Sequence, residues 1–166
     1  MQTLATILRK NLKGAERIAI LGVGSELRAD DAVGLLVSKQ IRKSFPKSRR
    51  VKIFLGHTAP ENLTSQIRKF KLSHLIIIDA LDMAKKPGAI AVIEPDKTDN
   101  MSFSTHKFPI ILTINYLFAA TACKTIIVGI QPYSLIFSEP VCEPVKKAAE
   151  KLSLLLIKAI GEALAQ

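Results

Sequence analysis

The segment of residues 18–34, IAILGVGSELRADDAVG, constrains the fold more than any other part of the chain. It begins as a continuous aliphatic run, turns at Gly22 and Gly24, and ends in Asp30 and Asp31 at the start of an amphipathic stretch. A continuous aliphatic run is typical of a strand buried on both faces, so the segment predicts a strand, a glycine turn and a helix start. In an open α/β sheet such a turn lies at the carboxyl ends of the strands, where ligands usually bind.

The rest of the chain alternates predicted strands and helices. Strands are expected at residues 17–21, 51–55, 74–79, 89–93 and 124–130, and helices at 3–13, 61–70, 109–121, 144–165 and between Asp30 and Pro46. This alternation predicts an α/β fold whose mostly parallel sheet carries helices on both faces. The link between the third and fourth strands is short, which favours an antiparallel arrangement of that pair. A length of 166 residues predicts one domain, residues 1–166.

Composition narrows the classes of function. The formal net charge is +10, but Lys and Arg are spread over several elements, and the chain has no Trp to stack on bases. We therefore expect a solvated basic surface and no nucleic-acid partner, although an acidic protein partner would also fit the charge. No apolar run is long enough to span a bilayer, and the first residues lack the apolar core of a signal peptide. A cytoplasmic protein without membrane insertion is expected.

The glycine turn does not match a dinucleotide-binding motif. The position of the third glycine is occupied by Leu27, and Gly56 and His57 stand where an acidic residue is needed after the second strand. The sequence also lacks a Walker lysine and the GxSxG turn of a hydrolase nucleophile.

Three carboxylates deserve separate interpretations. Asp30 is expected to be structural, by capping the helix or lying in its first turn, which leaves Asp31 to project toward the strand ends. Asp79 follows the aliphatic run of residues 75–78, at the mouth of a buried strand. Because an unpaired buried carboxylate is costly, Asp79 needs a helix start, a cation or a metal beside it.

His106 lies in a long polar segment after the fourth predicted strand. An exposed loop histidine is the simpler interpretation. If the first and third strands are neighbours, however, Asp31 and Asp79 share one edge of the sheet, and this long segment can reach the same edge. Two carboxylates and one imidazole can bind zinc, iron, nickel or manganese, and the donor set does not choose between them.

Five segments of the chain together resemble the [NiFe]-hydrogenase maturation endopeptidases. They are ILGVGSELRADDAVG, GHTAPEN, HLIIIDALDMAKKPGAIAVI, STHKFPI and IIVGIQPYSLIFSEP, and they occur in the order of the family. The DALDM, STHK and GIQP pieces look most like the branch that serves formate-hydrogenlyase-type hydrogenases. The resemblance implies a three-layer α/β sandwich with a twisted, mostly parallel five-stranded sheet. It also implies a metal site at Asp31, Asp79 and His106.

The same resemblance implies the function. We expect a nickel-dependent endopeptidase that removes the C-terminal extension of a [NiFe]-hydrogenase large-subunit precursor after nickel insertion. Asp31 and Asp79 are the expected catalytic residues, and nickel is expected to arrive with the precursor, although another divalent metal can occupy the site. Whether the metal polarises the scissile carbonyl or a carboxylate activates water stays open. A monomer is expected, since the enzyme must admit a large protein substrate.

One departure from the family and two alternative functions remain. Ser25 stands where the family usually has Asn after the second glycine, so we expect an altered loop geometry around Gly22, Gly24 and Asp30. One alternative function is a non-catalytic checkpoint or chaperone that binds the same precursor. The other is a basic enzyme similar to peptidyl-tRNA hydrolase, although the chain lacks the GNPG-type turn of that enzyme.

Overall fold

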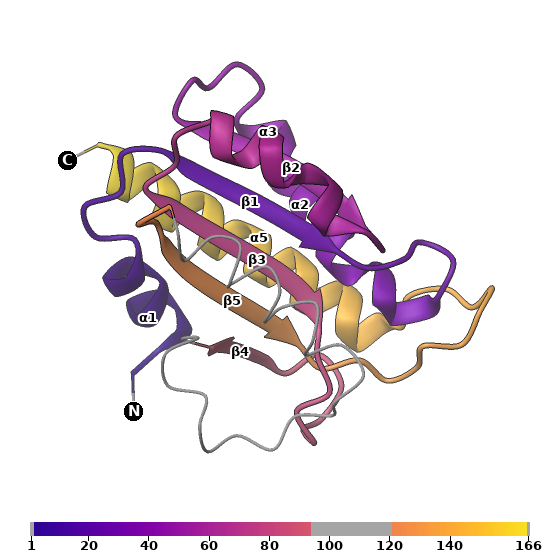
Figure 1. Ribbon diagram of the computed structural model, residues 1–166. Helices are drawn as coiled ribbons and strands as arrows, with labels where there is room; N and C mark the ends of the chain where they lie inside the picture. Colours follow the sequence, from indigo (N-terminus) through magenta and orange to yellow (C-terminus); the bar gives the residue numbers. More distant parts are fainter. Residues whose placement is uncertain (1, 94–120, 166) are drawn as a thin grey trace.

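A five-stranded mixed sheet forms the centre of the computed structural model, which describes residues 2–93 and 121–165 (Figure 1). The strand order is β2-β1-β3-β5-β4. Strands β2, β1, β3 and β5 run parallel, and β4 is antiparallel to β5. In chain order the elements are α1 (Leu4–Asn11), β1 (Ile18–Val23), η1 (Ala29–Ala32), α2 (Val33–Ser44), β2 (Val51–His57), η2 (Pro60–Leu63), α3 (Thr64–Lys69), β3 (His74–Ala80), β4 (Ile90–Ile93), β5 (Lys124–Ile130) and α5 (Glu143–Leu164).

The two central strands β1 and β3 are buried along their whole length. Their continuous aliphatic sequences place apolar side chains on both faces of the sheet, which is the pattern expected of parallel strands covered by helices. Strand β2 at the edge mixes buried, partly exposed and exposed residues instead. The predicted α/β class and the mostly parallel sheet are therefore confirmed.

The antiparallel strand is present, but its predicted partner is wrong. Strand β4 pairs with β5, with Ile90 opposite Ile130 and Ile93 opposite Ile127, and β5 lies between β4 and β3. Strand β3 is buried on both faces and pairs with parallel neighbours on both sides, which are β1 and β5. The partly exposed β4 is left for the edge of the sheet.

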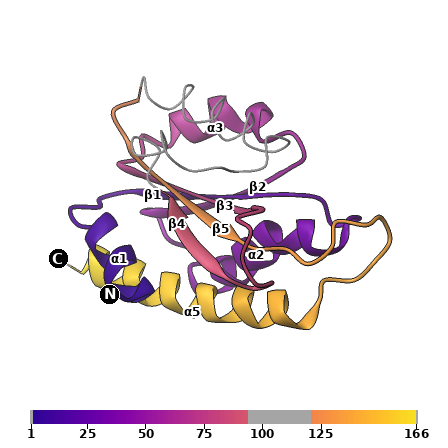
Figure 2. The same ribbon diagram turned by 90° about the horizontal axis from the view of Figure 1, so that it is seen from below.

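Helices cover both faces of the sheet and make three layers (Figure 2). Helices α1, α2 and α5 lie on one face, and α3 lies on the other. Because side chains alternate along a strand, each strand contributes to both apolar layers. The layer with α2 and α5 includes Ile20, Ile76 and Val128, whereas the layer with α3 includes Leu21, Ile77 and Ile127.

The helix predictions hold with local differences. Thr3 caps α1, because its side chain accepts a hydrogen bond from the backbone N–H of Thr6 at 3.2 Å. The helix predicted at residues 61–70 is divided into the 3-10 helix η2 and the α-helix α3. The helix predicted after Asp30 begins with the 3-10 turn η1, and α2 starts at Val33. The helix predicted at residues 109–121 lies outside the described residues, apart from its last position.

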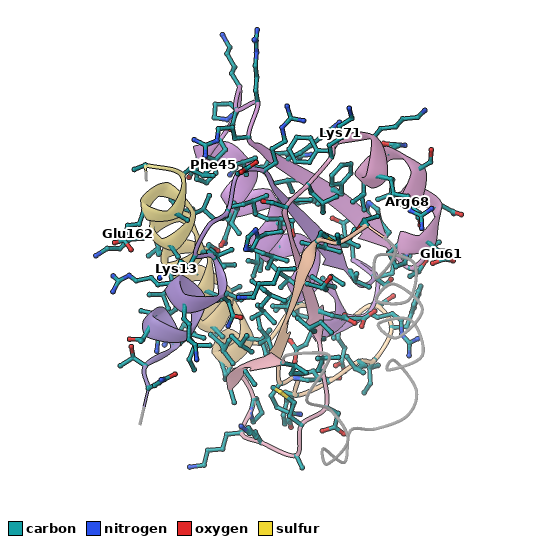
Figure 3. The ribbon with its side chains drawn as sticks, turned by 60° about the vertical axis from the view of Figure 1, so that its left-hand side comes forward. Lys13, Phe45, Glu61, Arg68, Lys71 and Glu162 are labelled. Carbon is teal, nitrogen blue, oxygen red and sulfur yellow. The ribbon has the colours of Figure 1, made fainter. Side chains whose placement is uncertain are left out.

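Charged side chains project from the outside of the layers (Figure 3). Lys71, Arg68 and Glu61 point outward around α3, and Glu162 points outward from α5. Glu162 also pairs with Arg9 at 2.6 Å and so ties α5 to α1, but both side chains are close to half exposed and the pair contributes little stability. Within the described ranges, no helix is both long and apolar enough to traverse a lipid bilayer.

Candidate functional site at the carboxyl edge of the sheet

Two glycines allow the start of α2 to lie directly over the strand ends. Gly24 has a φ of +132°, a backbone conformation that side chains disfavour, and a Cβ there would overlap the carbonyl oxygen of Asp31. A Cβ on Gly34 would overlap the carbonyl oxygens of Val23 and Ile78. The first turn of α2 therefore touches the backbones of β1 and β3 at their carboxyl ends.

The turn after β1 orients Asp31. The backbone N–H of Ser25 donates a hydrogen bond to Asp31 Oδ2 at 2.9 Å, and Asp31 is 5% exposed. The Ser25 hydroxyl accepts a hydrogen bond from the N–H of Leu27 at 3.3 Å, so Ser25 bonds its local backbone. The serine in place of the family's usual Asn thus belongs to a closed turn that fixes one oxygen of Asp31.

Asp30 has a structural role, and it lies in the first turn of η1, which is one of the two predicted positions, but it does not cap a helix. Neither η1 nor α2 has a side-chain cap. The fully buried Asp30 carboxylate instead accepts hydrogen bonds from the backbone N–H groups of Tyr133 (2.7 Å), Ser134 (3.1 Å) and Cys142 (2.7 Å) and from the Cys142 thiol (3.3 Å). Burial raises the pKa of Asp30, but these hydrogen bonds together bring it below its usual value. Asp30 therefore fastens the loop that leads from β5 to α5.

Asp79 is the most deeply buried carboxyl at this edge after Asp30, with 1% of the residue exposed. Its Oδ1 accepts a hydrogen bond from the backbone N–H of Ala80 at 2.8 Å. Burial raises the pKa of Asp79 from 3.8 to about 7, against the lowering effect of the Ala80 hydrogen bond. The carboxyl consequently exchanges its proton near neutral pH, a property that is common in functional sites.

The sheet brings Asp31 and Asp79 to the same edge. Strands β1 and β3 are parallel neighbours, with Gly22 opposite Ile78, and η1, which contains Asp31, contacts β3. Asp31 and Asp79 therefore lie at the same edge of the sheet, as the strand pattern predicts. His106, the third member of the predicted metal site, lies outside the described residues. Across residues 2–93 and 121–165, no three His, Cys, Asp or Glu side chains form a metal-binding group.

Gln131 is a residue of this edge that sequence reasoning missed. Its Oε1 accepts hydrogen bonds from the N–H groups of Met83 (2.7 Å) and Lys85 (3.2 Å), and its Nε2 donates to Asp82 Oδ1 (3.2 Å). The side chain therefore holds the turn after β3 against the end of β5. The available signal was a polar amide directly after the largely aliphatic stretch of residues 126–130.

Comparison with known proteins decides the family. A family model described as hydrogenase maturation protease matches residues 35–159, which is more than half of the chain. The chain belongs to the hydrogenase maturation protease family. The hydrogenase 3 maturation protease of Escherichia coli is 36% identical over 132 residues, which are 79% of this chain and 83% of the relative. A relative from Methanocaldococcus jannaschii, also named for hydrogenase maturation, is 35% identical over 94% of this chain and 95% of its own.

The solved structures agree with the family assignment. The [NiFe] hydrogenase maturation protease HycI from Thermococcus kodakarensis superimposes with a TM-score of 0.84 and 29% identity, over 93% of this chain and 99% of that one. A solved endopeptidase HycI from Escherichia coli has a TM-score of 0.70 and 30% identity over 86% of this chain and 90% of that one. This hydrogenase maturation protease is therefore a hydrolase of the endopeptidase class. The family assignment argues against the alternatives of a peptidyl-tRNA hydrolase and a non-catalytic checkpoint.

Proposed function

We propose that this endopeptidase removes the C-terminal extension of a [NiFe]-hydrogenase large-subunit precursor, and that it does so after nickel has been inserted. The relatives named above support the choice of substrate, because one is named for hydrogenase 3 and another for [NiFe] hydrogenase. We further propose that the enzyme works as a monomer in the cytoplasm, as expected from its sequence.

The carboxylates at the carboxyl edge of the sheet are the proposed nickel contacts. Asp31 and Asp79 lie at one edge and are 5% and 1% exposed. Two nearly buried carboxylates repel each other when both are ionised, and a divalent cation beside them offsets this cost. Their burial at a shared edge is the observation that carries the proposal. His106 is proposed as the third contact on the basis of the sequence, and nitrogen and oxygen donors suit nickel.

Nickel is proposed to arrive with the precursor and to leave with the processed subunit. Because the pKa of Asp79 is raised to about 7, the free enzyme has a protonated carboxyl in part of its molecules at neutral pH. A metal ion must displace this proton, which weakens binding of free nickel below neutral pH. We therefore expect the purified enzyme to retain less than stoichiometric nickel after dialysis.

Two kinds of chemistry fit the proposed arrangement of Asp31 and Asp79. Nickel held by Asp31 and Asp79 beside a peptide bond would supply Lewis-acid polarisation of the scissile carbonyl. Alternatively, a carboxylate takes a proton from the attacking water, and a pKa of about 7 suits Asp79 to that task near neutral pH. Both routes place the scissile bond at the carboxyl edge of β1 and β3.

The test of this proposal compares two forms of one precursor. A nickel-loaded large-subunit precursor and the same precursor made without nickel are each mixed with the enzyme, and the intact mass is followed over time. We expect loss of a C-terminal peptide from the nickel-loaded form alone. Equal cleavage of both forms would refute the nickel requirement, and cleavage of neither would refute the proposed substrate.

A further inference from the structure

Large apolar side chains gather beside the candidate site. Leu27, Tyr133, Ile136 and Phe137 form what we call the apolar rim. Their exposed fractions are 62%, 77%, 61% and 64%, in that order. Leu154 on α5, which is 69% exposed, is the remaining large exposed hydrophobic residue in the part of the chain that the structure describes. Concentrated apolar exposure of this kind marks interaction sites, whereas a single exposed residue such as Leu154 is ordinary.

The residues of the apolar rim come from two segments that are distant in the sequence but are hydrogen-bonded to each other. The N–H of Ser138 donates to the carbonyl of Leu27 at 2.8 Å, and the N–H of Asp30 donates to the carbonyl of Ser134 at 3.1 Å. Arg28 Nε also donates to the carbonyl of Leu135 at 3.2 Å. Figures 1 and 2 show the β5–α5 loop beside the connection from β1 to α2, beyond the carboxyl ends of the strands.

Polar contacts hold the rim in place. The carboxylate of Asp30 accepts from the backbone of Tyr133 and Ser134, and the Ser134 hydroxyl accepts from the N–H of Ile136 at 3.2 Å. The same hydroxyl is 2.9 Å from Glu139 Oε2. A loop fastened by its backbone loses little conformational entropy when a partner covers its side chains, so it is preorganised for binding.

The exposed area of the rim decides between two kinds of partner. With about 150–200 Å² for each side chain, the four exposed fractions amount to about 500 Å² of surface. A permanent homodimer buries about 1,000–2,500 Å² on each partner, of which about 65% is apolar, so the rim alone is too small for a permanent dimer. Its size fits a transient complex, which an enzyme needs in order to release its product.

We propose that the apolar rim is the surface on which the precursor protein docks while its scissile segment lies at Asp31 and Asp79. This inference rests on the proposed function for the identity of the precursor. Asp30, which fastens the loop that carries most of the rim, directly precedes Asp31, so this loop is attached to the segment that holds the candidate site. The precursor is expected to present a complementary apolar patch close to its cleavage site.

The test uses a double variant, Ile136→Ser with Phe137→Ser, and a matched control, Leu154→Ser. All three side chains are exposed, so each variant should fold with nearly the stability of the wild type, which thermal unfolding checks. Binding to the immobilised precursor is measured by biolayer interferometry, and cleavage in the same mixtures is followed by intact mass. We expect the double variant to bind at least tenfold more weakly, with KM raised and kcat nearly unchanged, and the control to match the wild type.

The outcomes separate this inference from the proposed function. Wild-type binding by the double variant overturns the docking surface, even where the mass readout shows cleavage. Weakened binding without cleavage by the wild-type enzyme supports the docking surface and overturns the proposed function. No binding by the wild-type enzyme overturns both. A wild-type dimer in sedimentation that the double variant abolishes would identify a second copy as the occupant and would also overturn the inference.

Discussion

Replacing Asp79 by Asn tests how much the buried carboxyl at the end of β3 lowers the free energy of unfolding. Burial raises the pKa of Asp79 from 3.8 to about 7. At a pH where Asp79 is ionised in both the folded and the unfolded chain, this raised pKa lowers the free energy of unfolding by about 4 kcal/mol. Asn has the shape of the protonated carboxyl, carries no charge and keeps an acceptor for the Ala80 N–H. The substitution should therefore stabilise the fold at neutral and alkaline pH.

The direction of the pH dependence follows from proton binding by Asp79. Between about pH 4 and pH 7 the folded chain retains a proton that the unfolded chain has released, so the free energy of unfolding falls as the pH rises. This contribution is fully present below the unfolded pKa of 3.8 and is lost through the folded pKa of about 7. We expect Asp79→Asn to exceed the wild type by about 4 kcal/mol at pH 8 and by less than about 1 kcal/mol at pH 4.

Urea unfolding followed by circular dichroism measures this difference at several pH values. A chelator is included, because a bound divalent cation would stabilise the ionised carboxyl of the wild type. Glu61→Gln is the matched control, since it removes an exposed carboxylate from the outside of the molecule. A variant that is no more stable than the wild type at pH 8, or whose advantage is the same at pH 4, would refute the reasoning.

Two further predictions concern the packing around the site. Gly34→Ala places a methyl group against the carbonyls of Val23 and Ile78, so we expect α2 to move outward at a cost of about 3 kcal/mol, and wild-type stability in urea would contradict this. Asp30→Ala removes the acceptor of three backbone N–H groups, so we expect a loss of about 3 kcal/mol and faster amide exchange at Tyr133 and Cys142. Because the folded pKa of Asp30 is lowered, this stability is present above the unfolded pKa of 3.8 and is lost as the pH falls below it; unchanged amide protection would rule out the assigned role.

The central strands could be predicted from sequence because their signal is local. The aliphatic runs of β3 and β5 carry their own evidence of burial, and both strands were placed within a residue of their observed bounds. The partner of β4 could not be predicted in this way. It depends on β5, which follows β4 by about thirty residues and occupies the place beside β3.

The candidate site shows the same division between local and distant contacts. Asp31 and Asp79 each follow a strand that the local sequence predicts, although their place at one edge also needs β1 and β3 to be neighbours, which the structure shows. The role of Asp30 does not, because its hydrogen-bond partners are 103 to 112 residues away along the chain. The local pattern predicted a helix cap or a place in the first turn, and it gave no sign that the carboxylate would bind the distant loop. Gln131 was missed for the same reason, since it bonds residues 46 to 49 positions away.

The most direct test of the account is single-turnover cleavage of the nickel-loaded precursor by the wild type and by Asp31→Asn and Asp79→Asn. Asp82→Asn serves as the matched control, because this exposed residue lies in the turn directly after β3. The account predicts that Asp31→Asn and Asp79→Asn each slow cleavage at least a hundredfold while binding to the precursor persists, and that Asp82→Asn stays within a few-fold of the wild type. Cleavage at the wild-type rate by either Asp31→Asn or Asp79→Asn would contradict the assignment of that carboxylate to the active site.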